Sequence, residues 1–537
     1  FSEDGAMLGG KNNVLDSGIN SAIIAGENNN LKDSDNSVIS AGTGNDLTNV
    51  TGSSIVAGSI NSINKSSGSM VAGKLNSISG SSDSSITAGT GNSISGSSDS
   101  SINAGALNFI SGSSDSSINA GVGNSGIDLT GSSISAGTGN SISGSVYSSI
   151  SAGTSNFLSG SEDSSINAGI ENGIIDSTGS AIVAGKENLL SDSENSSVIV
   201  GQKNIIEGSK RSSVGAGSGN YISGDSSFIG AGMGNSSYKD KSAILSGENN
   251  VVSGNRSIVG GGLMNEGFGE NSSILGGKNN LIEEDTDSAS ILGGRHNQVT
   301  KGLQSALLGG RDNTISGDHS SLVGGSGNSI FGDSAVLLGG SGNRVSATTS
   351  AIVGGGGNNI DDSTDSVIAA GHLNSLSGSK YSSVVAGTGN SIINSTGVVA
   401  VAGINNEITG SNSSSINAGT GNKIVNSPEA SITAGRSNYL SGSDRSSINV
   451  GFLNTLNESN DSSINAGTGN YLSGSYYSSI NAGQRHTLNE SDDSSISAGT
   501  GNYLSGSDSS FIGAGEENSG TNSHESAIIA GEKNLLS

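Results

Sequence analysis

The chain has 537 residues, with 88 Gly, one Pro and neither Cys nor Trp, and its 22 basic and 47 acidic residues give a net charge of −25. This charge argues against partners such as nucleic acid or anionic membrane surfaces, because binding either requires an excess of basic side chains. The absence of Cys excludes disulfides, thiolate metal sites and cysteine nucleophiles. No long apolar run that would insert into a membrane, and no N-terminal signal pattern, is visible, so we expect a mature or excised segment.

One short phrase repeats from one end of the chain to the other. An Asn placed three residues after a Gly recurs from Asn13 to Asn534, mostly every 16 residues, with His486 standing in for one Asn. The step shortens to 15 between Asn220 and Asn280 and lengthens to 17 from there to the next repeat Asn. No linker interrupts the series, which predicts one continuous solenoid domain over residues 1–537 with about 34 turns. Representative corner residues of the repeat are Asn92, Asn140, Asn313 and Asn470.

Each repeat contains two strand-like segments, as at 92–96 and 101–105. Within both, Ile alternates with small or polar residues, which is the period of a β-strand, and the density of Gly, Ser and Asn excludes a helix. The intervening Gly-, Asn- and Asp-containing segments suit corners. Two strands and two corners per repeat predict an all-β parallel β-solenoid, or β-roll. We expect the Ile and the Ala or Gly two residues later, such as Ile274 and Gly276, to point inward.

The residue between those two positions is expected to point outward, and its character changes along the chain. It is polar between residues 87 and 167, apolar in the middle, and polar again between residues 417 and 497. A stripe of Leu and Val on the outside of a soluble monomer is unfavourable, so we predict a seam between subunits. A strand phase shifted by one residue is the alternative. The predicted seam residues are Leu245, Leu275, Leu292, Leu308, Val323, Leu338 and Val353.

The repeat cycle resembles a known family. Residues 309–322, GGRDNTISGDHSSL, are similar to the YadA-like head repeats of trimeric autotransporter adhesins. The resemblance extends over essentially the whole chain and implies a left-handed parallel β-roll assembled as a homotrimer. It also implies an extracellular location on the surface of a Gram-negative bacterium, held there by a C-terminal outer-membrane anchor outside this segment.

The resemblance implies a rigid adhesin head that attaches to host cells, to extracellular matrix proteins or to other bacteria. Its partners would be two further copies of itself and a receptor on the opposing surface, without direct membrane insertion by this segment. Two alternatives remain open. One is a monomeric β-solenoid that binds polysaccharide or ice, and the other is a solenoid enzyme acting on polysaccharide. The scattered Thr residues and the lack of aperiodic charged residues in a groove speak against these alternatives.

The sequence predicts no catalytic residues, no metal site and no cofactor. The five His residues are scattered over different turns, and we expect each at an exposed corner. No strand–elbow–helix context surrounds any Ser, as a hydrolase nucleophile requires. The acidic segment 283–287 suits either a solvated loop or a calcium ligand set.

Exposed aromatic residues are the candidate ligand contacts. Several Tyr residues directly follow the repeat Asn, and three of them are spaced by 32 residues, so they are expected to recur on every second turn along one line. Exposed Tyr on a rigid frame favours recognition, although packing at the corners is the alternative. The candidate contacts are Tyr439, Tyr471, Tyr476, Tyr477 and Tyr503. A rival region is 203–344, which holds half of the basic residues, including Lys210, Arg211, Arg295 and Arg311.

Overall fold

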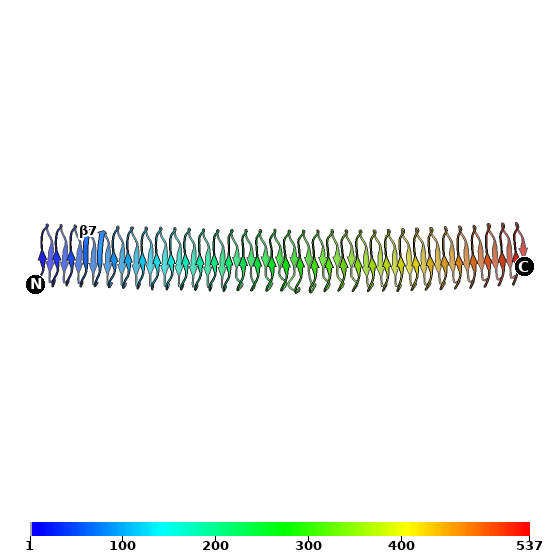
Figure 1. Cartoon of the computed structure of the whole chain (residues 1–537), viewed down its shortest axis with the longest axis horizontal. Coiled ribbons are helices and arrows are strands. Elements are labelled where there is room, and N and C mark those ends of the chain that lie inside the picture. The colour runs from blue at the N-terminus through cyan, green and yellow to red at the C-terminus, as the bar shows by residue number, and fades with distance from the viewer. Residues whose placement is uncertain (1–2) are drawn as a thin grey trace. The chain divides into compact units, whose positions relative to one another are not determined.

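The computed structural model describes residues 3–537, which form 68 short strands and no helix. All described strand pairs are parallel, for example β10 (Ser77–Ser79) with β12 (Ser93–Ser95), and each turn adds one strand to each of two ladders (Figure 1). The prediction of an all-β parallel β-solenoid is therefore confirmed. The chain divides into two compact units, residues 1–265 and 266–537, which are described separately. Left-handed winding and a single uninterrupted domain stay predictions.

The two ladders differ in strand length. In the first unit, most even-numbered strands have three residues, like β12, and most odd-numbered strands have two, like β13 (Ser101–Ile102). The exceptions are the longer β7 (Ser54–Ser59), which is labelled in Figure 1, and β9 (Met70–Lys74). Their register shifts between Ile55 and Ala57, so Val56 forms a bulge. The bulge accommodates a further 15-residue step of the repeat, from Asn61 to Asn76.

Other changes in the number of residues per repeat are accommodated at the corner that follows the even-numbered strand. In a 15-residue turn, β28 (Tyr221–Ile222) is one residue shorter than β12 and lacks the left-handed Gly that follows the longer strand, such as Gly96 at φ 60°. The next strand, β29 (Phe228–Ile229), still pairs in register with β27 (Ser213–Val214). Insertions and deletions at this corner therefore leave the side-chain columns of both ladders aligned.

The interior of most turns holds one Ile, Leu or Val from each strand. Ile94 and Ile102 are typical, and both are fully buried. Between them and the corners lie three buried polar positions in each 16-residue turn, occupied for example by Asn92, Ser97 and Ser100. Each turn is thin, so polar side chains at the corners are also buried in the interior. Their hydrogen bonds decide whether this arrangement is stable.

The repeat Asn residues form a hydrogen-bonded ladder that joins successive turns. The Nδ2 of Asn140 donates to the carbonyls of Ala136 and Gly153 at 3.0 and 3.1 Å. Its Oδ1 accepts the backbone N–H of Asn156 at 3.0 Å. Asn92, Asn313 and Asn470 are buried in the same way. These Asn residues are thus structural ladder residues inside the solenoid.

Serine residues build parallel ladders at the opposite corner. The backbone N–H of Ser97 donates to Ser81 Oγ at 3.1 Å, and Ser97 Oγ donates to the Ser95 carbonyl at 3.0 Å. Each hydroxyl thereby accepts from the next turn and donates within its own. The frequent Ser of the repeat is explained by this double use, because a buried hydroxyl without partners is unfavourable.

One expectation about the interior is wrong. Ile274 is fully buried, but a Cβ built on Gly276 would meet nothing within 4 Å. The strand β35 (Ser273–Ile274) ends before this position, and the chain turns into the corner through Gly277 at φ 99°. Inward–outward alternation requires extended backbone, so it stops where the strand stops.

Candidate functional site

Six of the predicted seam residues form an exposed apolar stripe in the second unit. Each follows directly after an odd-numbered strand, as Leu292 follows β37 (Ser290–Ile291) and Leu308 follows β39 (Ala306–Leu307). Successive turns of the solenoid, which we call rungs, are hydrogen-bonded through the backbone. For example, the N–H of Leu292 donates to the Leu307 carbonyl at 3.0 Å. The exposed fractions are 46% for Leu292 and 41% for Leu308. The stripe comprises Leu275, Leu292, Leu308, Val323, Leu338 and Val353.

A row of glycines borders this apolar stripe. The residue after each stripe residue is Gly, and a Cβ built on any of these glycines would meet nothing within 4 Å. The Leu and Val side chains therefore stand beside a surface without side chains, which lets another backbone approach closely. Leu245, the remaining predicted seam residue, lies in the first unit and is 52% exposed.

Toward the C-terminus the same column is polar and bonded along its own length. Asn449 Nδ2 donates to Asn465 Oδ1 at 2.6 Å, and Asn465 Nδ2 donates to Asn481 Oδ1 at 2.8 Å. These side chains satisfy one another without a partner molecule. The position directly after the odd-numbered strands therefore presents an apolar surface in the stripe and a hydrogen-bonded polar surface in the Asn row of the second unit.

Three of the candidate Tyr residues lie on the outer face of the even-numbered strands. Tyr439 begins β56 (Tyr439–Ser441), Tyr471 begins β60 (Tyr471–Ser473) and Tyr503 begins β64 (Tyr503–Ser505). Thr455 and Thr487 occupy the rungs between them in register. The result is a Tyr–Thr ladder, with Tyr residues about 9.6 Å apart and each Tyr residue 37–40% exposed.

Tyr476 and Tyr477 lie at the corner that follows β60, beyond the end of that strand. Tyr477 has a left-handed backbone (φ 54°) and is 66% exposed, and the backbone N–H of Tyr476 donates to Asp492 Oδ1 at 2.7 Å. These two residues therefore lie beside the Tyr–Thr ladder rather than in it.

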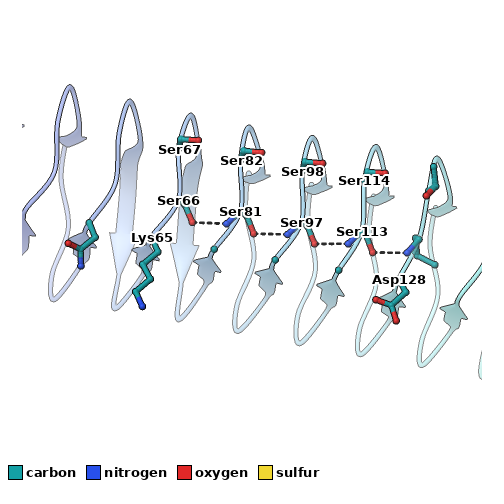
Figure 2. Close-up of a pocket in the computed structure, with 16 residues that line it drawn as sticks. Lys65, Ser66, Ser67, Ser81, Ser82, Ser97, Ser98, Ser113, Ser114 and Asp128 are labelled. Carbon is teal, nitrogen blue, oxygen red and sulfur yellow. Dashed lines mark hydrogen bonds between the residues drawn. The ribbon is translucent and has the colours of Figure 1, made fainter.

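An open groove in the first unit runs along the Ser corner over several turns (Figure 2). Its volume is about 800 Å³, and Ser and Gly form most of its lining. Ser66, Ser81, Ser97 and Ser113 accept backbone N–H groups from the following turns, as the dashed lines in Figure 2 show.

The groove has only two ionisable lining residues, Lys65 and Asp128. They lie four rungs apart, which corresponds to about 19 Å. That separation is too large for a Lys and an Asp to act together on one bond, and the buried hydroxyls are already engaged. We assign no catalytic role to the groove.

Among residues 3–537, no group of three His, Asp or Glu side chains is placed to hold a metal ion. Within the same residues, no helix is long and apolar enough to cross a bilayer.

Comparison with known proteins leaves the family open. No protein family profile and no curated protein sequence matches the chain. A solved structure described as an acetyltransferase from Desulfovibrio desulfuricans G20 aligns with 11% identity over 44% of this chain and 65% of its own, with a TM-score of 0.09. A score this low carries no argument about fold or activity.

His486 corrects the expectation that every His occupies an exposed corner. It is fully buried, because it replaces a repeat Asn and faces inward as that Asn would. Its Nδ1 accepts the backbone N–H of Asn502 at 3.2 Å, which assigns the proton of the neutral ring to Nε2. Within the described residues, Nε2 lies near the carbonyls of Ala482 and Gly499 but makes no hydrogen bond of good geometry. Burial lowers the pKa of His486.

We expect this residue to make the C-terminal turns sensitive to acid. The pKa is lowered in the folded chain, so the unfolded chain binds a proton first, and stability is lost as the pH falls below about 6.5. Protonation also places an N–H on Nδ1. This N–H would face the backbone N–H of Asn502, so the hydrogen bond between them would be lost. Hydrogen exchange of the Asn502 amide between pH 7.5 and 5 measures the effect.

The variant His486→Asn is the matched control, because Asn restores both donors and the acceptor of the ladder. We expect it to be more stable by about 1–2 kcal/mol at pH 7 and to lack the additional loss on acidification. An unchanged pH dependence in this variant would show that other groups cause the acid sensitivity.

Lys278 was not among the basic residues that the sequence pattern singled out. Lys278 stands two residues before a repeat Asn, as Arg295 and Arg311 do, and the structure pairs these positions on successive rungs. Their shared distance from the repeat Asn was the available signal.

Proposed function

We propose that the chain is the head of a trimeric surface adhesin, a rigid β-solenoid that presents its outer faces to a receptor. The observation that carries the proposal is the apolar stripe with its glycine border. Soluble monomers rarely expose contiguous apolar surface of this kind, and a partner strand surface of the same type would cover it. The resemblance of the repeats to YadA-like heads supports three copies around a common axis and a bacterial surface location.

The assembly state tests this proposal directly. Sedimentation of the purified chain at micromolar concentration is expected to give three times the mass of one chain. A monomer would contradict the trimeric adhesin and favour a solitary solenoid that binds polysaccharide or ice. The Thr–Tyr alternation argues against ice, because the Thr residues of the ladder do not occupy adjacent rungs.

The Tyr–Thr ladder and the adjoining corner are the proposed receptor contacts. The five Tyr residues are exposed, lie on rigid strands or at a tight corner, and would be presented three times by a trimer. Weak contacts repeated in this way add through multivalency. The receptor would be a host surface or matrix protein, or a molecule on another bacterium.

Replacing these five Tyr residues with Ser is expected to reduce cell attachment by about tenfold or more while the trimer mass stays unchanged. Exposed aromatic contacts each contribute on the order of 1–2 kcal/mol in interfaces, so the loss of several exceeds one power of ten. Attachment of bacteria or coated beads to cultured cells measures this. The variant replaces Tyr439, Tyr471, Tyr476, Tyr477 and Tyr503.

The matched control replaces Tyr147 and Tyr381, which are 64% and 66% exposed at corners elsewhere. The control is expected to attach normally. Normal attachment of the five-Ser variant, together with loss of attachment after charge reversal in region 203–344, would move the contact surface to the basic region.

A further inference from the structure

Three basic side chains lie on consecutive rungs of the second unit. Lys278 pairs with Arg295, and Arg295 pairs with Arg311, through parallel backbone bridges. The N–H groups of all three donate to the carbonyl groups of the next turn at 2.9 Å, so their column is fixed by the ladder itself. Because adjacent rungs are about 4.8 Å apart, three cations occupy about 9.6 Å of one edge. We call these three residues the cationic ladder.

The cationic ladder is only partly neutralised, because one of its three side chains has an acidic partner. Asp312 pairs with Arg311, with its Oδ2 3.2 Å from Nε. The other oxygen of Asp312 lies 3.3 Å from His296 Nδ1. Within residues 3–537, Lys278 and Arg295 make no ion pair. Like charges on directly neighbouring strands repel each other, so this arrangement is unfavourable until an anion joins it.

The surroundings of the cationic ladder leave room for a ligand. Arg295 is exposed, the Arg311 side chain is 65% exposed and Lys278 is half-buried. The same column continues with Ser326 and Ser341, whose small hydroxyl side chains extend the edge without blocking it. A ligand can therefore lie along the column and meet a guanidinium or an ammonium group on each of three rungs.

We propose that the cationic ladder is a binding site for a sulfated polysaccharide. Such a polymer carries closely spaced anionic groups along one chain, and Arg binds planar or tetrahedral oxyanions through two parallel hydrogen bonds. The inference concerns one chain and does not depend on the trimer.

A nucleic acid fits the site less well. Single-stranded nucleic acids bind proteins largely through aromatic rings on which their bases stack. The rungs of the cationic ladder carry no Phe, Tyr or Trp in this column or in the next one. A sulfated polysaccharide has no bases and does not require such rings.

The test uses a heparin octasaccharide and the full chain. The triple variant Lys278→Ser, Arg295→Ser and Arg311→Ser places in each position the residue that Ser326 and Ser341 already show to be compatible with the column. We expect its dissociation constant for the octasaccharide to rise at least tenfold at 0.15 M salt, with an unchanged melting temperature. The wild-type affinity should fall as salt increases, because the contacts are charged and exposed.

The control variant removes three positive charges from the first unit, through Lys186→Ser, Lys203→Ser and Lys210→Ser. These Lys residues already pair with Glu187 or Glu194, so we expect the affinity to change less than threefold. Equal losses in both triple variants, or no loss in either, would overturn the proposal. So would a single-stranded oligodeoxynucleotide that binds the wild type as tightly as heparin does.

A single variant, Arg295→Gln, keeps the test decisive if the triple variant folds poorly. It removes only the central charge, and we expect a weakening of about threefold or more. Unchanged affinity in a folded Arg295→Gln chain would also overturn the proposal.

Discussion

Placing a carboxylate on the apolar stripe, through Leu292→Asp or Leu308→Asp, is expected to dissociate the proposed trimer while each chain keeps its solenoid fold. Both side chains are almost half exposed in the single chain, so Asp adds little strain to the turn itself. In the assembly, the same position would bury three unpaired carboxylates near a common axis, at a cost of several kcal/mol or a raised pKa. Sedimentation gives the assembly state, and circular dichroism checks the fold.

The matched variant is Asn465→Asp, in the polar part of the same column. It breaks the hydrogen bond from Asn465 Nδ2 to Asn481 Oδ1 but leaves the apolar stripe intact, so we expect it to remain trimeric. If the Leu variants also keep the trimer mass and melting temperature of the wild type, the subunits associate through another face.

The second large effect is expected inside the solenoid, at Asn140→Leu. Leu has a similar size but offers no hydrogen bond, so the backbone N–H of Asn156 loses its acceptor and the carbonyl of Ala136 loses a donor. Two unsatisfied buried groups of this kind cost about 4 kcal/mol together. Because solenoids lose stability turn by turn, the damage should centre on the turns that contain Asn140 and Asn156.

Hydrogen exchange read out by mass spectrometry locates this effect. Peptides around Asn156 should exchange much faster in the variant, and peptides several turns away should exchange as in the wild type. The control is Ser141→Ala, next to Asn140 on the outer side of β18 (Ser141–Ser143), which should change exchange little. Similar protection in Asn140→Leu and the wild type would mean that the Asn ladder contributes little to stability.

The period of the repeat already determined most of the fold. A strand can bury only every second side chain, so the recurrence of Ile at fixed distances from Asn specified which strand positions face inward, and the buried Ile94 and Ile102 agree with that expectation. The Gly and Asn content specified corners in place of helices. The outward position of Leu292 and its neighbours also follows from alternation, and their exposure in the single chain rules out the strand phase shifted by one residue.

Alternation gave no guidance at the corners, where the backbone is not extended. Gly276 does not face inward, because β35 ends two residues earlier. His486 was expected at an exposed corner, like the other scattered His residues. It is buried, because the backbone of the Asn ladder fixes the direction of whichever side chain occupies that position.

Only the tertiary structure decided which distant side chains share a column. Lys278 and Arg295 are 17 residues apart, whereas Arg295 and Arg311 are 16 apart, so a constant period would offset the first pair by one residue. The extra residue is accommodated at the corner after β36 (Leu281–Ile282), where Thr286 Oγ1 donates to the Glu283 carbonyl at 2.7 Å. Backbone pairing between turns is thus restored before the chain reaches Arg295. Hydrogen bonds between turns set the register, and the sequence alone does not say at which corner an added residue is absorbed.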